Sequence, residues 1–221
     1  YRALIRDEQV RGFIKVLLVS WLALASWYTL TTELHWLEAL RHVAVNITSV
    51  MTTTGFAVGD YHLWGPFASM IFFYLGFVGG CSGSTAGGLK IFRFQVAYIL
   101  LKANLKQLVH PRAVIKQNYN RHRLDEDIAR SILAFSFFFT ITIAVLALAL
   151  AMCGLDWITA LTGAAATVSG VGPGMGPIIG PAGNYAGLPE IAKWLLTIGM
   201  LLGRLEILTV LVLLFPAFWR H

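Results

Sequence analysis

The chain has 221 residues, of which 57% are hydrophobic and only 13% are charged. Ordinary soluble domains carry about 25% charged residues, so this composition excludes that class and indicates a helical protein that crosses a membrane several times. The net charge of +6 does not indicate a nucleic-acid-binding protein, because the 17 lysines and arginines lie in blocks, four in the first 15 residues and nine between Lys90 and Arg130. Such blocks beside apolar runs are typical of the cytoplasmic side of a membrane protein.

The first predicted element is a membrane-spanning helix at Val16–Thr32. Its 17 uncharged residues are just enough to cross the hydrocarbon core, with Lys15 at the inner surface. The next segment, HWLEALRHVAVNITSV at His35–Val50, is amphipathic and too polar to cross. A segment of this length is typical of a re-entrant helix, which dips into the membrane and returns. It ends in TTTGF, Thr52–Phe56.

The third predicted helix, Pro66–Val78, is too short to cross the membrane. Proline is favoured at the first helical position, and Gly79 and Gly80 are expected to end the helix, because each glycine costs about 1 kcal/mol relative to alanine. The helix then covers about 20 Å of a hydrocarbon core of about 30 Å. A loop of small residues, GGCSGSTAGGLK, fills the remaining depth before a second helical segment starts at Ile91.

The second half of the chain repeats this order of segments. Ser131–Leu155 has 25 uncharged residues and is predicted to span the membrane. Asp156–Ser169, DWITALTGAAATVS, has only 14 residues, so it is a second candidate re-entrant helix, and it leads into SGVGPG. Trp194–Trp219 is predicted to be the last spanning helix, with Arg204 and Glu206 inside it.

The starts of the two re-entrant segments match, since HWLEAL and DWITAL share a polar residue, Trp, an aliphatic residue, and Ala-Leu. We therefore predict an all-α polytopic membrane protein with two helix–re-entrant pore helix–helix repeats, the second helix of the first repeat being broken. The predicted units are a first repeat at 1–110, a basic cytoplasmic linker at 111–126 and a second repeat at 127–221. The basic blocks place both ends and the linker in the cytoplasm. The opposite side carries Glu33, Glu38, Asp60, Asp156 and Glu190.

The loops after the two re-entrant helices have the composition of an ion selectivity filter. The C-terminus of a re-entrant helix brings unpaired carbonyls and partial negative charge to mid-membrane, and further carbonyls can replace the hydration shell of K⁺. In the first loop the threonines supply carbonyls and hydroxyls, Gly55 permits the backbone turn, and Phe56 can wedge the loop from behind. In the second loop Gly172 takes the place of Gly55. The predicted filter residues are Thr53, Thr54, Gly55, Phe56, Gly170, Val171, Gly172 and Pro173, with K⁺ held by Thr53, Thr54, Gly55, Val171 and Gly172.

The loop GGCSGSTAGGLK resembles a phosphate-binding loop, but the pattern G-x-x-x-x-G-K-[ST] fails, because Leu89 precedes Lys90 and Ile91 follows it. Small residues in a broken helix at mid-membrane mark ion pathways; a plain patch for helix packing is the alternative. A charge in the last helix is costly and usually functional, so we expect Arg204 to bond the carbonyls of this loop and hold a closed state. The loop and Arg204 would then form a gate, and Lys90 is either part of this gate or an anchor at the inner membrane surface. Glu206 is expected to pair with a basic residue of a neighbouring helix.

Two stretches of the chain resemble the Trk/Ktr/HKT superfamily of potassium transporters, and within it the TrkH-type bacterial uptake subunits. They are TTTGFAVGDYHLWGPFASMIFFYLGFVGGCSGSTAGGLKIFR and GPGMGPIIGPAGNYAGLPEIAKWLLTIGMLLGRLEILTVLVLLFPAFW, and the resemblance covers essentially the whole chain. It implies four units with pseudo-fourfold symmetry around one pore, of which this chain holds the third and fourth, and a gate formed by the loop beneath the filter. The gate residues would be Gly79, Gly80, Ser82, Gly83, Ser84, Thr85, Gly87, Gly88, Lys90 and Arg204. The fourth strand departs from the threonine-rich pattern, so fewer hydroxyls would line the path there.

The resemblance implies K⁺ uptake across the bacterial inner membrane through a channel-like pore, with transport coupled to H⁺ or Na⁺ as the alternative. The chain lacks a catalytic constellation, so we do not expect an enzyme, and the transported K⁺ takes the place of a cofactor. Two strands cannot close a fourfold ring, so we expect a fragment that needs an N-terminal half, although two chains could also combine. The expected partners are lipid, a second copy in a homodimer and a TrkA-like nucleotide-binding regulatory subunit, with no nucleic acid.

Overall fold

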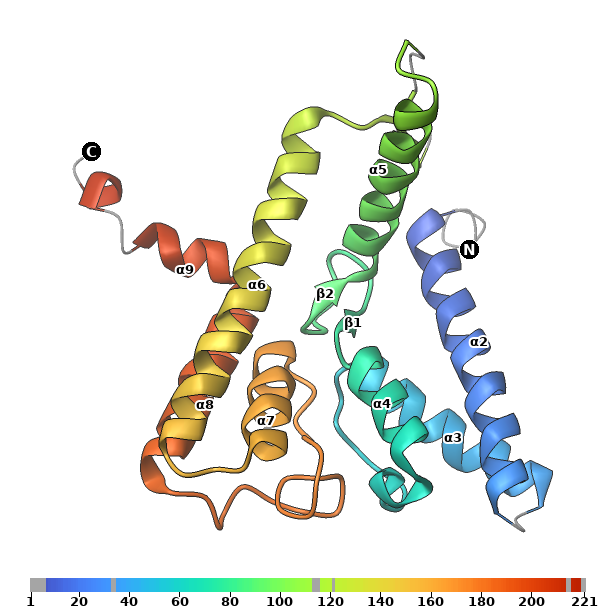
Figure 1. Ribbon diagram of the computed structural model, residues 1–221, viewed down its shortest axis with the longest axis vertical. Helices are drawn as coiled ribbons and strands as arrows, with labels where there is room; N and C mark the ends of the chain where they lie inside the picture. Colours follow the sequence, from blue (N-terminus) through green and yellow to red (C-terminus); the bar gives the residue numbers. More distant parts are fainter. Residues whose placement is uncertain (1–6, 33–34, 113–115, 121, 214–215, 220–221) are drawn as a thin grey trace.

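A computed structural model describes residues 7–32, 35–112, 116–120, 122–213 and 216–219. The described chain is almost entirely helical, and its two halves stand side by side (Figure 1). Glu33 and the two ends of the chain, which the sequence analysis used for the topology, lie outside the described residues.

Two helices among the described residues are long and apolar enough to cross a membrane. Helix α2 runs Glu8–Thr31, and α6 runs Glu126–Met152. Helix α2 begins earlier than the apolar run, because the side chain of Asp7 accepts a hydrogen bond from the backbone N–H of Gln9 and caps the helix. The two helices cover most of the segments that the sequence predicts to span, and α6 ends three residues before the predicted end at Leu155.

Two short helices pack against these long ones. Helix α3 runs Trp36–Met51 beside α2, and α7 runs Trp157–Ser169 and packs against both α6 and α8 (Figure 1). The carboxylate of Asp156 accepts a hydrogen bond of 3.1 Å from the backbone N–H of Thr159, which fixes the start of α7. Most of α7 is buried, including several threonines, so this helix lies in the interior of the fold.

The half-helix of the first half is shorter than the sequence analysis predicts. After the 3₁₀ turn η1, Tyr61–Trp64, helix α4 runs Pro66–Leu75 and is capped by Gly76, so its predicted end at Val78 is wrong. Strand β1, Val78–Gly79, pairs in parallel with β2, Leu89–Lys90, which the all-α prediction missed. A Cβ atom on Gly79 would overlap the carbonyl oxygen of Gly87. This glycine therefore allows two backbone segments to approach, rather than ending a helix.

The segment after β2 forms helix α5, Ile91–Val109, which is followed by a small hairpin. Strands β3, Asn118–Tyr119, and β4, His122–Arg123, pair antiparallel inside the predicted linker. The hydroxyl of Tyr119 donates a hydrogen bond of 2.6 Å to the side chain of Gln95 on α5. The linker is therefore attached to α5 instead of extending freely from it.

The predicted last helix is broken. Helix α8 runs Glu190–Arg204, α9 runs Ile207–Leu213, and the 3₁₀ turn η2 covers Pro216–Trp219. Between the two helices Glu206 has a φ of 55°, and α9 turns away from α8 (Figure 1). The prediction of one helix across 194–219 is therefore wrong. Non-glycine residues rarely adopt this left-handed backbone. Positions 205 and 206 hold neither glycine nor proline, so the local sequence does not predict the break.

Small residues on α8 allow it to pack directly on α7. A Cβ atom on Gly203 would overlap the carbonyl oxygen of Val168. We therefore expect Gly203→Ala to lower the stability of the fold by about 1–3 kcal/mol, the range typical of overpacking. The thermal unfolding midpoint of the detergent-solubilised protein, followed by circular dichroism, measures the effect. Gly187→Ala is the control, because a Cβ there meets nothing within 4 Å, and equal midpoints for the two variants would contradict the prediction.

Candidate functional site

The two loops that follow α3 and α7 touch each other. A Cβ atom built on Gly55 would lie 2.5 Å from the carbonyl oxygen of Val171 and 3.3 Å from Cδ of Pro173. Gly55 and Gly172 have φ values of 78° and 102°, in the region that favours glycine. The sequence therefore places glycine where the backbone is left-handed and where the first loop rests on the second.

The hydroxyls of Thr53 and Thr54 in the first loop bond to two different parts of the chain. The hydroxyl of Thr54 lies 3.2 Å from the carbonyl oxygen of Ser49 and 3.1 Å from its hydroxyl, so it is directed back to the last turn of α3. The hydroxyl of Thr53, a residue with φ of 56°, accepts a hydrogen bond of 3.0 Å from the backbone N–H of Gly87. The expected wedge does not form within the described chain, because Phe56 is 80% exposed.

The loop between β1 and β2 reaches both of these loops. Gly87 donates to Thr53 of the first loop, and a Cβ atom on Gly87 would overlap the carbonyl oxygen of Ser169, at the start of the second. We call residues 79–90 the inner loop. Its glycines are required by these close approaches and by positive φ values at Gly83 and Gly88.

Two cationic side chains bond successive carbonyls of the inner loop. The ammonium group of Lys90 donates to the carbonyl oxygens of Ser84, at 2.9 Å, and Ala86. The guanidinium group of Arg204 donates from Nη1 to the carbonyl oxygen of Thr85, which lies between them. Of the two roles left open for Lys90, the described contacts favour membership of the loop.

A third cationic side chain, that of Arg93, connects the chain after the inner loop to the break between α8 and α9. Arg93, on α5, pairs with Glu206 at 3.5 Å, as the sequence analysis expected for a basic residue on a neighbouring helix. The guanidinium carbon of Arg93 also lies 3.6 Å from the centre of the Phe135 ring on α6. A cation over an aromatic face is attracted to it, so Arg93 ties α5 to both α6 and Glu206.

Two cavities adjoin at the inner loop. One, of about 410 Å³, is lined by both filter-like loops, and the other, of about 290 Å³, by Lys90, Arg93 and Glu206 among others. Four residues line both cavities: Thr85, Gly87, Gly203 and Arg204. The inner loop and Arg204 therefore form a partition between the two spaces. Three of these four residues, Thr85, Gly87 and Arg204, are predicted gate residues, and Gly203 is not.

The structure also brings three unpredicted polar side chains to the filter-like loops. Asn46 and Thr162 project from α3 and α7, and Tyr185 lies in the segment before α8; each hydrogen-bonds to the backbone of one of these loops or of its continuation. Asn46 and Thr162 are each a polar side chain flanked by apolar residues, and Tyr185 follows Asn184 in a loop, so nothing in the local sequence marks any of the three. The pattern of small residues and hydroxyls drew attention to the loops themselves and not to what holds them.

A sequence profile of the TrkH family, described as cation transport proteins, matches residues 12–220. The chain belongs to the TrkH family. It is 56% identical over 219 residues to the Trk system potassium uptake protein TrkI of Halomonas elongata, a match that covers 99% of this chain and 44% of that protein. It is 34% identical to the Trk system potassium uptake protein TrkH of Escherichia coli K12, covering 98% of this chain and 44% of that protein.

Structural comparison agrees with this family. The crystal structure of the potassium transporter TrkH from Vibrio parahaemolyticus matches with a TM-score of 0.91 and 31% sequence identity, over 98% of this chain and 46% of that one. The chain therefore has the mostly helical fold of a polytopic membrane transporter, and the prediction that it is no enzyme is confirmed. It spans less than half the length of these TrkH-family relatives.

Proposed function

We propose that this chain forms the part of a bacterial potassium uptake protein that carries two strands of the selectivity filter and the gate beneath them. The observation that best supports this proposal is the partition. Thr85, Gly87 and Arg204 separate a cavity lined by both filter-like loops from a second cavity on the other side. The relatives named above are potassium uptake proteins, which supports K⁺ as the transported ion.

The filter acts through backbone carbonyls. Left-handed glycines at 55 and 172 allow the two loops to turn their carbonyls toward the cavity that both of them line. Carbonyl dipoles in such a ring replace the water that a K⁺ ion loses on entering. The C-termini of α3 and α7 add their negative ends to the same region, which compensates a cation for its lost hydration.

The gate acts through charge and through obstruction. Arg204 places a positive charge at the partition and holds the Thr85 carbonyl, while Lys90 holds the carbonyls on either side. A K⁺ ion that crosses the partition must pass these charges. Opening therefore requires the inner loop to leave Arg204, and the loop can then move as one segment.

The same proposal extends to the assembly. Residues 1–110 and 127–221 are two pore units related by pseudo-fourfold symmetry, joined by the linker 111–126. Two further units come from an N-terminal half, since two strands cannot enclose an ion. The linker and both ends of this segment face the cytoplasm, where a TrkA-like nucleotide-binding subunit would bind, and the complete protein is a homodimer in the inner membrane.

A flux measurement on the full-length protein in liposomes tests the proposal. A channel-like pore is expected to move K⁺ down its gradient alone and to carry no K⁺ against it when a proton or Na⁺ gradient is imposed. Uphill K⁺ uptake driven by either gradient would instead establish the coupled transporter. Absence of K⁺ flux under all gradients would contradict both functions.

A further inference from the structure

A side chain from α3 holds the backbone just beyond the first filter strand. The side chain of Asn46 is fully buried and makes two hydrogen bonds to Val58, three residues past Gly55. Its Nδ2 donates to the Val58 carbonyl oxygen at 3.0 Å, and its Oδ1 accepts from the Val58 N–H at 2.8 Å. Both backbone groups of Val58 are thereby fixed to the helix.

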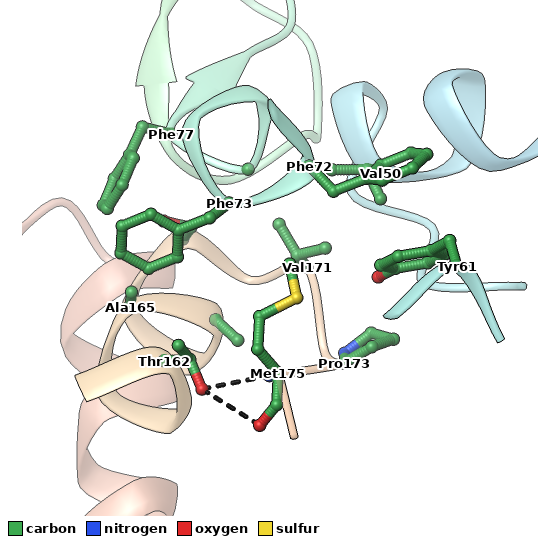
Figure 2. A pocket seen from close by; sticks show the side chains of 14 residues that line it. Val50, Tyr61, Phe72, Phe73, Phe77, Thr162, Ala165, Val171, Pro173 and Met175 are labelled. Atoms are coloured by element: carbon green, nitrogen blue, oxygen red, sulfur yellow. Dashed lines mark hydrogen bonds between the residues drawn. The ribbon is translucent and has the colours of Figure 1, made fainter. Parts of the chain in front are cut away.

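A side chain from α7 occupies the corresponding position on the second strand. Met175, three residues past Gly172, donates its backbone N–H to the hydroxyl of Thr162 at 3.0 Å (Figure 2). The hydroxyl proton has two acceptors, the Ile158 carbonyl at 2.7 Å and the Met175 carbonyl at 3.4 Å. A hydroxyl has one proton, and the shorter bond takes it, so Thr162 fixes Met175 by its N–H alone.

The second strand is also held from behind by apolar side chains. Val171 and Met175 line a small cavity of about 20 Å³ together with Tyr61 and Phe72 (Figure 2). Apolar packing opposes separation but is not directional, and methionine adapts readily to its surroundings. This contact alone therefore does not fix where the carbonyls of the strand point.

A second directional hydrogen bond fixes a carbonyl group of the second strand, which Thr162 does not do. The hydroxyl of Tyr185 donates to the carbonyl oxygen of Gly172 at 2.5 Å. Burial raises the pKa of Tyr185 from its ordinary value of 10.0 to about 12, so the phenol keeps its proton at any physiological pH. Tyr185 therefore binds a carbonyl of the second filter strand itself. In the first strand, Asn46 binds Val58, which lies three residues beyond Gly55.

We infer that Thr162 and Tyr185 are positioning residues that set the cation selectivity of the strand Gly170–Pro173. Thr162 fixes the outer end of the strand, and Tyr185 fixes the direction and the field of the Gly172 carbonyl. With both bonds in place this carbonyl cannot follow a smaller ion inward, which favours K⁺ over Na⁺. The inference rests on the filter function proposed above and adds which side chains tune it.

Substitution of these side chains in the full-length protein tests the inference. Tyr185→Phe keeps the ring and removes the bond, and Thr162→Val removes the hydroxyl at nearly constant shape. Loss of one hydrogen bond is expected to lower the K⁺:Na⁺ flux ratio in liposomes about two- to tenfold, with Thr162→Ser restoring it. Thr142→Val is the control, because that exposed hydroxyl bonds only the Phe138 carbonyl of its own helix, at 2.8 Å.

Each outcome decides between the inference and the proposed function. An unchanged ratio in Tyr185→Phe, with Gly55→Ser lowering it, would overturn the inference and leave the filter in place. An unchanged ratio in all these variants would overturn the filter as well. An equal fall in Thr142→Val, or no rescue by Thr162→Ser, would also overturn the inference. If Thr162→Val does not fold, as its unfolding midpoint would reveal, Tyr185→Phe decides alone.

Discussion

Gly55→Ser is expected to remove most of the discrimination between K⁺ and Na⁺. A residue with a side chain in the left-handed region costs about 1–2 kcal/mol, and here the added Cβ would also lie 2.5 Å from the Val171 carbonyl oxygen. Either Gly55 changes its backbone or the second strand moves, and both displace filter carbonyls. We expect the K⁺:Na⁺ flux ratio to fall about tenfold or more, since tenfold corresponds to about 1.4 kcal/mol.

Gly59 provides a matched control for this substitution. Its φ is 74°, close to the 78° of Gly55, but a Cβ there meets nothing within 4 Å. Gly59→Ser therefore carries the same backbone strain without the contact on Val171. Flux ratios measured side by side in liposomes separate the two effects, and an equal fall in both variants would show that strain alone, and not contact between the strands, is responsible.

Arg204→Ala is expected to raise the rate of K⁺ flux. The substitution removes a positive charge from the partition and frees the Thr85 carbonyl, while Lys90 still holds the carbonyls of Ser84 and Ala86. A hydrogen bond from a charged group contributes about 1.5–3 kcal/mol, so we expect the ratio of open to closed gates to rise about tenfold or more. The initial rate of K⁺ uptake into liposomes measures this.

Two further variants define what Arg204 contributes. Arg204→Lys keeps the charge and loses the planar group, so a flux between those of the wild type and Arg204→Ala is expected. Lys193→Ala, on the same helix, removes an exposed pair with Glu190 at 3.0 Å, and such pairs contribute little. Flux that stays at the wild-type level in Arg204→Ala would refute the gate.

Composition and periodicity predicted the parts of the fold that long apolar runs determine. The segments of α2 and α6 follow from the number of uncharged residues, and α3 and α7 follow from segments too short or too polar to cross. The break at Glu206 was not predictable, because a left-handed backbone at a non-glycine residue has no local mark in the sequence. Strands β1 and β2 were also missed, since two residues each carry no alternation.

The sequence predicted the loops of the candidate site, but not the side chains that hold these loops in place. Hydroxyls and glycines cluster in sequence at 52–55, 79–88 and 169–174, and this drew attention to all three loops. Nothing in the local sequence marks Asn46, Thr162 or Tyr185, and their backbone partners lie 12 or 13 positions away. Such pairings depend on how the chain turns after a helix, which single residues do not reveal.

In the function proposed above, the contacts of Gly87 couple the filter and the gate thermodynamically. Gly87 donates to the Thr53 hydroxyl and rests on the backbone at Ser169, so a loop that moves away loses a bond to one strand and support from the other. A shift in one equilibrium then shifts the second by an equal free energy, in either direction. Under the proposed function, a cation bound between the strands is therefore an effector of the gate, and we expect an opened gate to lower the affinity for that cation.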